Sequence, residues 1–324
     1  MDEAITLQIR NLSTVFRTEY GEARAVDHVS LDVPHGAIIG IVGESGCGKS
    51  VTARSVMKLL KYPGRITGGE ILLEGRDLVP LSEAEMSSVR GEEISMIFQE
   101  PMTSLNPVVP VGKQVQEVVL QHRRVSREEA KEKVLHIFET VGISEPEKRY
   151  HAYPHELSGG LRQRVMIAMA MICRPKLLIA DEPTTALDVT VEAQIIRLLR
   201  ELRDTIGTSI ILISHDLGVI AEVCDYVYVM YAGEVVEQAN VYTLFDEPMH
   251  PYTRGLMEAV RSLRGAEKTL KTIPGNVPNL LHLPTGCHFA PRCANACEEC
   301  METRPALACA GGDHFVRCPF GREA

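Results

Sequence analysis

The segment from Gly43 to Ser50, GESGCGKS, places three glycines, a lysine and a serine at fixed spacing. Glycines at its first, fourth and sixth places let the backbone curl so that successive N–H groups point at one anion. Lysine at the seventh place can reach the β- and γ-phosphates of a nucleoside triphosphate, and serine at the eighth can bind Mg²⁺. The pattern predicts a phosphate-binding loop comprising Gly43, Glu44, Ser45, Gly46, Cys47, Gly48, Lys49 and Ser50.

Two elements must position this loop. The apolar run GAIIGIVG (36–43) predicts a buried strand, and GKSVTARSVMKLL (48–60) predicts a helix. A helix that begins at the loop adds the positive end of its dipole to the anion site. The alternative is a glycine-rich turn that matches the motif by chance. Such a turn would not need a buried strand before it and a helix after it.

A pair of carboxylates, Asp181 and Glu182, ends the apolar run LLIADE. In proteins with such a loop, an Asp at the end of a neighbouring buried strand holds Mg²⁺. The Glu beside it could accept a proton from the attacking water. The alternative is an ordinary acidic pair where a strand enters a loop.

Further strands and helices alternate along the chain. Residues 5–35 predict antiparallel strands, 69–75, 94–101 and 208–216 each predict a strand, 176–183 predicts a buried strand, and 226–238 predicts a hairpin. Amphipathic helices are expected between about 103 and 165, one of them capped by Ser126 with Glu129 three residues later. This alternation is typical of a parallel α/β sheet with a helical insertion.

The composition restricts the class of protein. The chain has 324 residues and a net charge of −9, which disfavours wholesale binding to nucleic acid. We see no signal peptide and no apolar run of about 18 residues. We therefore expect a cytosolic protein whose thiols stay reduced.

Six motifs in order resemble the ATPase subunits of ABC transporters: GESGCGKS, FQEP, LSGGLRQR, LLIADE, ALD and SHD. The resemblance implies an α/β fold, with a P-loop NTPase core of the ABC type, an antiparallel β subdomain and a helical subdomain. It places the ATPase domain at 1–262, the helical subdomain at about 103–165 and a Cys-rich C-terminal extension at 263–324, called here the Cys-rich tail.

The resemblance also implies a head-to-tail dimer with ATP between the phosphate-binding loop of one subunit and the LSGG segment of the other. Ser158, Gly159 and Gly160 would contact that second nucleotide, and Leu161 stands where the family usually has glutamine. Gln99 resembles the glutamine that senses Mg²⁺ or water, and His215 resembles the histidine that holds the γ-phosphate. Leu187 and Asp188 resemble the D-loop.

An aromatic residue near the N-terminus stacks on adenine in this family, and both Phe16 and Tyr20 are candidates. Tyr20 precedes Gly21 at an expected turn, whereas Phe16 falls within an expected strand.

The segments HPYTRGL (250–256) and IPG (273–275) resemble the importers of dipeptides, oligopeptides and nickel. This resemblance implies two membrane-spanning permease subunits, usually a second related ATPase, an extracytoplasmic solute-binding protein and a peripheral place on the cytoplasmic face of the membrane. The ATPase does not touch the solute, so peptide is expected, with nickel or another solute as the alternative.

Six of the nine cysteines lie at or after residue 287. The resemblance selects Cys287, Cys293, Cys300 and Cys318 as ligands, with the spacing C-x5-C-x6-C and a later fourth cysteine. Four thiolates in a Pro/Gly-rich segment without a core of its own suggest a metal staple, either a [4Fe–4S] cluster or Zn²⁺. Cysteines that bind no metal are the third reading.

Arg292 and Arg304 could offset the charge of a thiolate-bound cluster, and Cys47, Cys173 and Cys224 are expected to be packing residues. A soluble ABC ATPase that acts on nucleic acid is a rival function, as is an iron–sulfur sensor whose output is ATPase activity.

Overall fold

The computed structural model describes residues 4–99, 104–185, 187–263 and 273–320. The chain forms two compact units. The first comprises Met1–Thr6, Pro34–Ala37 and Leu81–Ile211, and the second comprises Leu7–Val33, Ile38–Pro80 and Leu212–Ala324. Among the described helices, none is long and apolar enough to cross a membrane.

The sheet strands of the first unit are short and buried. β6 (Ile94–Ile97) pairs in parallel with β7 (Leu177–Asp181), with Ile94 opposite Leu177. All residues of both strands are buried, as expected for a parallel sheet covered on both faces. β8 (Ser209–Ile213) follows β7 in the sheet and carries the chain from the first unit into the second.

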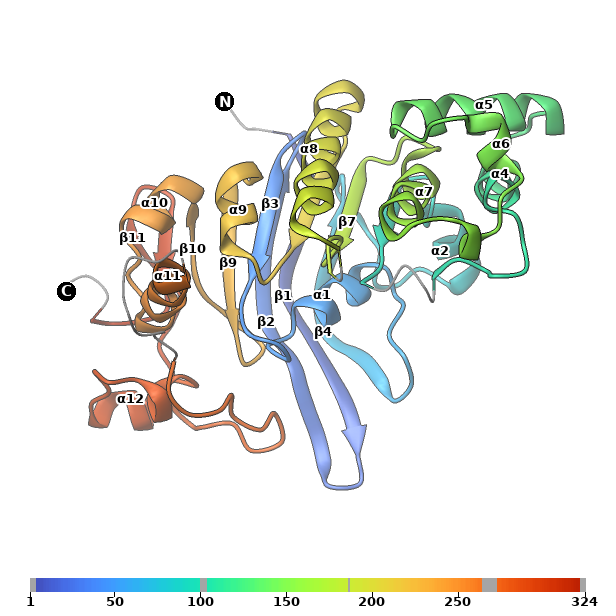
Figure 1. The fold of residues 1–324 in the computed structure, drawn as a ribbon. Coiled ribbons are helices and arrows are strands. Elements are labelled where there is room, and N and C mark those ends of the chain that lie inside the picture. Colours follow the sequence, from blue (N-terminus) through green and yellow to red (C-terminus); the bar gives the residue numbers. More distant parts are fainter. Residues whose placement is uncertain (1–3, 100–103, 186, 264–272, 321–324) are drawn as a thin grey trace. The chain divides into compact units, whose positions relative to one another are not determined.

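Helices make up most of the rest of the first unit. They are α2 (Glu83–Val89), α4 (Val111–His122), α5 (Arg127–Thr140), α6 (Pro146–Tyr150), the 3₁₀ turn Pro154–Glu156, α7 (Gly159–Met171) and α8 (Val189–Ile206). Of these, α4, α5, α6 and α7 lie together in the green part of Figure 1. The Ser126 cap is confirmed, because its hydroxyl accepts from Glu129 N at 3.1 Å and the Glu129 carboxylate accepts from Ser126 N at 2.8 Å.

An antiparallel sheet with the order β2-β1-β4-β5 forms one part of the second unit. Its strands are β1 (Ile5–Thr18, part of this unit from Leu7), β2 (Gly21–Pro34), β4 (Gly64–Leu73) and β5 (Arg76–Asp77). β1 pairs with β4 so that Phe16 lies opposite Gly64. The predicted strand at 69–75 therefore begins five residues earlier than its apolar pattern indicates.

The other sheet of the second unit runs β11-β12-β10-β9-β3. β3 (Ile38–Val42) is parallel to β9 (Tyr226–Tyr231), and β10 (Glu234–Asn240) completes the predicted hairpin with β9. β11 (Ala308–Gly311) and β12 (His314–Val316) come from the Cys-rich tail and extend the sheet at β10.

The helices of the second unit are α1 (Lys49–Val56), α9 (Leu217–Val223), α10 (Val241–Asp246), α11 (Pro251–Leu263), the 3₁₀ turn Ala290–Arg292 and α12 (Glu298–Glu302). α1 ends four residues before the predicted end of the helix at residue 60, since Lys58 adopts a left-handed φ of 49°.

The described part of the Cys-rich tail buries apolar side chains against residues that precede it in the chain. Phe289 and Val316 are buried, and the Phe289 ring packs against Tyr231 and Tyr252 of the sheet and α11. The described part of the tail is therefore joined to the rest of the second unit by apolar contacts as well as by strand pairing. The predicted domain boundary at 262/263 adjoins residues 264–272, which lie outside the described residues.

Candidate functional site

The phosphate-binding loop follows β3 and leads into α1, as its sequence predicts. Gly43 has a φ of +148°, and a Cβ at this position would come within 2.2 Å of the Met230 carbonyl oxygen. Gly48 has a φ of +107°, and its Cβ would meet the Ala25 carbonyl oxygen at 2.4 Å. Both positions thus exclude a side chain by conformation and by close backbone approach.

Lys49 turns back onto the loop that precedes it. Its Nζ donates to the carbonyl oxygens of Gly43 at 2.7 Å and Glu44 at 3.1 Å, and its side chain is only 5% exposed. The backbone N–H of Glu44 makes a separate hydrogen bond, which it donates to the Tyr252 hydroxyl of α11 at 2.8 Å. The loop is therefore braced by its own lysine and by α11.

His215 follows β8 on the same sheet edge as the loop. Ser214 N donates to the Ile41 carbonyl oxygen at 3.4 Å, and Asp216 N donates to the Ser214 hydroxyl at 3.0 Å. These bonds fix the turn that presents His215, whose side chain is exposed. The arrangement is compatible with the predicted contact between His215 and a γ-phosphate.

The predicted catalytic carboxylate lies in the first unit. Glu182 follows the buried Asp181 at the end of β7 and has a left-handed φ of 49°. Its Oε2 accepts from Gln99 Nε2 at 2.8 Å and from Thr185 Oγ1 at 3.0 Å. Two residues that the sequence singled out separately, Gln99 and Glu182, are thus brought into direct contact.

The LSGG segment begins α7. The Ser158 hydroxyl caps this helix by accepting from Leu161 N at 3.3 Å. A Cβ on Gly160 would lie 2.9 Å from Val191 Cγ1 of α8, which explains why the helix start needs glycine here. Gly159 lies beside Leu187, since a Cβ on it would meet Leu187 Cδ2 at 3.5 Å.

The two aromatic candidates differ in environment. Phe16 is half-buried in β1, where its ring packs on Gly64. Tyr20 is 80% exposed in the turn between β1 and β2. Both lie in the same unit as the phosphate-binding loop, and the choice between them remains a prediction to test.

The four cysteines selected by spacing line one pocket of the second unit. Cys287, Cys293, Cys300 and Cys318 face a space of about 170 Å³ together with apolar groups that include Phe289. Burial raises the pKa of the Cys287 and Cys293 thiols.

The two remaining tail cysteines, Cys297 and Cys309, do not line this pocket, although Cys297 Sγ lies 3.6 Å from Cys300 Sγ. Within the described ranges, no group of three or more His, Cys, Asp or Glu side chains is arranged to hold a metal ion. The four thiols therefore line one pocket, but their sulfur atoms are not arranged as the ligands of a metal ion.

The other three cysteines behave as the sequence predicts. Cys47, Cys173 and Cys224 are buried, and burial raises the pKa of each thiol. They are packing residues rather than reactive thiolates.

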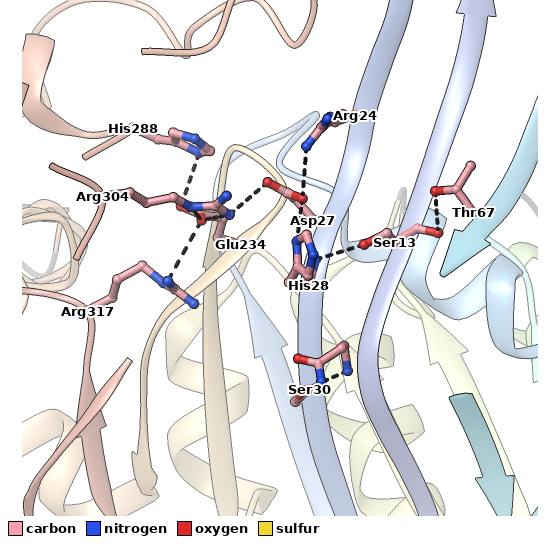
Figure 2. A network of polar contacts seen from close by, with 11 residues as sticks. Ser13, Arg24, Asp27, His28, Ser30, Thr67, Glu234, His288, Arg304 and Arg317 are labelled. Carbon is pink, nitrogen blue, oxygen red and sulfur yellow. Dashed lines mark hydrogen bonds and ion pairs between the residues drawn. The ribbon is translucent and has the colours of Figure 1, made fainter. Parts of the chain in front are cut away.

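Arg292 and Arg304, which the sequence suggested as counter-charges for a cluster, have carboxylate partners of their own. Arg292 pairs with Glu44, and Arg304 bridges the buried carboxylates of Asp27 and Glu234. Figure 2 shows Arg304 between these two carboxylates, with Arg317 and His288 also directed at Glu234. Buried carboxylates require such partners, and the sequence alone does not reveal which carboxylates are buried.

Sequence reasoning missed the residues that hold Glu44. Tyr252 belongs to the HPYTRGL segment, which served only as a family marker, and Arg292 was considered only beside the cysteines. No local sequence signal identifies these two contacts, because they join residues that lie 208 and 248 positions apart.

Comparisons with known proteins agree with this geometry. A family model described as ABC transporter matches residues 26–185, and one described as oligopeptide/dipeptide transporter, C-terminal region, matches residues 236–300. The oligopeptide transport ATP-binding protein OppD of Bacillus subtilis is 51% identical over 313 residues, covering 96% of this chain and 87% of that protein. OppD of Escherichia coli is 52% identical over 299 residues, covering 92% and 88%.

Solved structures show the same fold. A dimeric ATP-binding cassette in a post-hydrolysis state with ADP and Pi has a TM-score of 0.66 and 26% identity, covering 72% of this chain and 98% of that chain. CbiO1 from Clostridium perfringens, part of the CbiONQ complex, has a TM-score of 0.65 and 28% identity, covering 76% and 92%. The predicted ABC ATPase fold, with its mixed α/β sheets, is confirmed. The chain belongs to the ATP-binding proteins of ABC transporters, in the family of the oligopeptide and dipeptide transporters.

Proposed function

We propose that this chain is the ATP-hydrolysing subunit of an importer that takes up dipeptides or oligopeptides. The observation that carries the proposal is the phosphate-binding loop, whose glycines are required sterically and whose Lys49 is braced against it. The two relatives named above are oligopeptide transport proteins, and the matching C-terminal family is that of oligopeptide and dipeptide transporters, which favours peptide over nickel and over a nucleic-acid-acting ATPase.

The loop would bind the phosphates of ATP through its N–H groups and Lys49. Ser50 and Asp181 offer the hydroxyl and carboxylate oxygens that Mg²⁺ prefers, and the ion would neutralise charge on the phosphates. Glu182, oriented by Gln99 and Thr185, would accept the proton of the attacking water, and His215 would hold the γ-phosphate.

The second nucleotide face implies a partner ATPase. Ser158, Gly159 and Gly160 present the start of α7, where free N–H groups favour an anion. In the proposed assembly this face closes on ATP bound by another subunit, identical or related. Two permease subunits and a solute-binding protein complete the importer, and the chain acts peripherally on the cytoplasmic face of the membrane.

Transport and hydrolysis test the proposal together. Purified protein should hydrolyse ATP with Mg²⁺, and cells that depend on a supplied peptide should grow with the wild-type chain but not with Lys49→Ala. Lys113→Ala is the matched control, because Lys113 is exposed on α4. Normal peptide uptake by the Lys49→Ala variant would overturn the proposal.

We further propose that the Cys-rich tail, residues 263–324, is a separate extension of an ATPase domain at 1–262, whose helical subdomain spans about 103–165. In the tail, Cys287, Cys293, Cys300 and Cys318 would hold a [4Fe–4S] cluster. Their common pocket and the exclusion of Cys297 and Cys309 from it support this set. Zn²⁺ is the alternative occupant.

Metal analysis distinguishes these cases. Anaerobically purified protein should contain iron and sulfide and absorb broadly near about 400 nm, as iron–sulfur proteins do. Cys293→Ser should lose both, whereas Cys309→Ser, outside the pocket, should keep them. Stoichiometric zinc without colour would show that the pocket is a zinc site and not a cluster site. The absence of both iron and zinc would overturn the proposal of a metal site.

A further inference from the structure

Arg292 of the Cys-rich tail makes a two-point ion pair with the phosphate-binding loop. Its Nη1 lies 2.6 Å from Glu44 Oε2 and its Nη2 lies 3.0 Å from Glu44 Oε1. The Arg292 side chain is only 5% exposed. Paired hydrogen bonds between a guanidinium and a carboxylate are among the stronger and more directional contacts in proteins, because both groups are planar and charged.

The guanidinium is fixed by further contacts from the second unit. Arg292 Nε donates to the Pro274 carbonyl oxygen at 2.8 Å, and Nη2 donates to that of Ile273 at 3.2 Å. The group also lies over the rings of Tyr231 and Phe289, 5.7 and 5.9 Å from their centroids. The hydrogen bonds that Arg292 donates to Glu44 raise the pKa of Arg292 further above its usual value, so the guanidinium stays charged.

Glu44 is consequently held at each of its polar groups. Its N–H donates to the Tyr252 hydroxyl, its carbonyl oxygen accepts from Lys49 Nζ, and its carboxylate accepts from Arg292. Glu44 is the second residue of the loop that is proposed to bind the phosphates of ATP. A carboxylate left unpaired there would repel a polyphosphate and release the loop from its braced conformation.

We propose that Arg292 is a positioning residue for nucleotide binding: it neutralises and orients Glu44, so that the Cys-rich tail sets the affinity of the phosphate-binding loop for ATP. The inference rests on the proposed function, in which this loop binds ATP. It gives the tail a direct mechanical and electrostatic connection to the ATPase site, independent of whether the tail holds a metal.

A purely structural role makes a different prediction. If Arg292 only anchored the tail, its loss would lower thermal stability as the loss of any other tail anchor does, and the charge on Glu44 would be irrelevant. His314 supplies the matched anchor, because its Nε2 lies 2.7 Å from Glu237 Oε1 and, among the described residues, it pairs with β10 rather than with the phosphate-binding loop.

The test is a double-mutant cycle on the full-length chain, with Arg292→Ala, Glu44→Gln and the combined variant, together with Arg292→Lys and His314→Ala. Dissociation constants for ATP are measured by calorimetry, KM and kcat by steady-state hydrolysis, and melting temperature by calorimetric scanning. The cycle isolates the charge on Glu44 from other effects of losing Arg292.

Arg292→Ala is expected to raise the dissociation constant and KM for ATP about tenfold, the scale of one charge-assisted contact, with a smaller effect on kcat. Adding Glu44→Gln should recover most of the lost affinity, and Arg292→Lys should recover part of it. His314→Ala should lower the melting temperature without changing ATP affinity. If Arg292→Ala does not fold, the Arg292→Lys and Glu44→Gln variants still report the coupling.

Two results overturn the inference: an Arg292→Ala affinity within about twofold of wild type, or a combined variant that binds ATP no better than Arg292→Ala, since a factor of two is well below one such contact. Failure of the wild-type chain to bind ATP would instead overturn the proposed function, so the two failures are distinguishable.

Discussion

The Gln99 side-chain amide donates to the Glu182 carboxylate, with 2.8 Å between Nε2 and Oε2. Thr185 Oγ1 donates to the same oxygen at 3.0 Å. The two donors fix the orientation of a carboxylate that sits at the end of a buried strand with a left-handed backbone. The strain is small in energy but typical of residues placed for function.

Glu182→Gln tests the proposed general base. An amide cannot accept the proton of the attacking water, so kcat should fall by about 10²- to 10⁴-fold while ATP affinity stays close to wild type. Single-turnover hydrolysis and equilibrium ATP binding measure the two effects separately. Glu201→Gln, an exposed change on α8, is the control, and unchanged turnover in Glu182→Gln would remove Glu182 as the base.

Two glycines of the phosphate-binding loop, Gly46 and Gly43, should differ in how much their replacement by alanine lowers the free energy of unfolding. Gly46 has a φ of +80° with open space around it, so Gly46→Ala should cost only the backbone strain, about 1 kcal/mol in the free energy of unfolding. Gly43→Ala adds a clash with the Met230 carbonyl oxygen, for which overpacking costs suggest about 1–3 kcal/mol more. Urea unfolding of both variants measures the difference, and equal costs would contradict the steric argument.

Sequence patterns predicted the phosphate-binding loop, the strands around it and the capped helix at Ser126, because each depends on local chemistry: glycine conformation, apolar periodicity and a capping hydroxyl. They did not predict that Arg292 and Tyr252 hold Glu44, since those contacts join residues separated by 248 and 208 positions. Tertiary pairing of this kind has no local signature.

The same limit explains the Cys-rich tail. Its proline, glycine and cysteine content suggested a segment without a core, yet β12 pairs with β10 and Phe289 packs against Tyr231. Short strands such as β11 and β12 gain their stability from an existing sheet. Their own three or four residues carry too little pattern to be recognised.

The buried carboxylate of Glu237 predicts a dependence of stability on pH. Burial by itself would raise its pKa, but the hydrogen bond with His314 and those donated by Met249 N and His250 N lower it below the usual value. A carboxyl with a depressed folded-state pKa stabilises the protein above its unfolded pKa, and this contribution is lost as the pH falls through the folded pKa.

Glu237→Gln should therefore lower the free energy of unfolding by about 1–3 kcal/mol at pH 7, the cost of disturbing a buried charged hydrogen bond. The difference from wild type should shrink below pH 4.5, where the wild-type carboxyl begins to be protonated in the unfolded chain. Urea unfolding from pH 7 to pH 3 measures the trend. A difference that stays constant across this range would show that the charge on Glu237 is not responsible.

Ser158 and Ser126 provide a matched pair for the last prediction. Each caps a helix of the first unit: the Ser158 hydroxyl accepts from Leu161 N at 3.3 Å, and the Ser126 hydroxyl accepts from Glu129 N at 3.1 Å. Ser→Ala at either position should cost about 1 kcal/mol of stability, as loss of an N-cap usually does.

Only Ser158 lies in the segment proposed to meet the nucleotide of a second subunit. Ser158→Ala should therefore lower ATP hydrolysis by the assembled importer at saturating ATP, whereas Ser126→Ala should leave it unchanged. Thermal unfolding and ATPase assays on both variants measure the two effects, and equal activity losses would mean that Ser158 acts on hydrolysis only through the stability of α7.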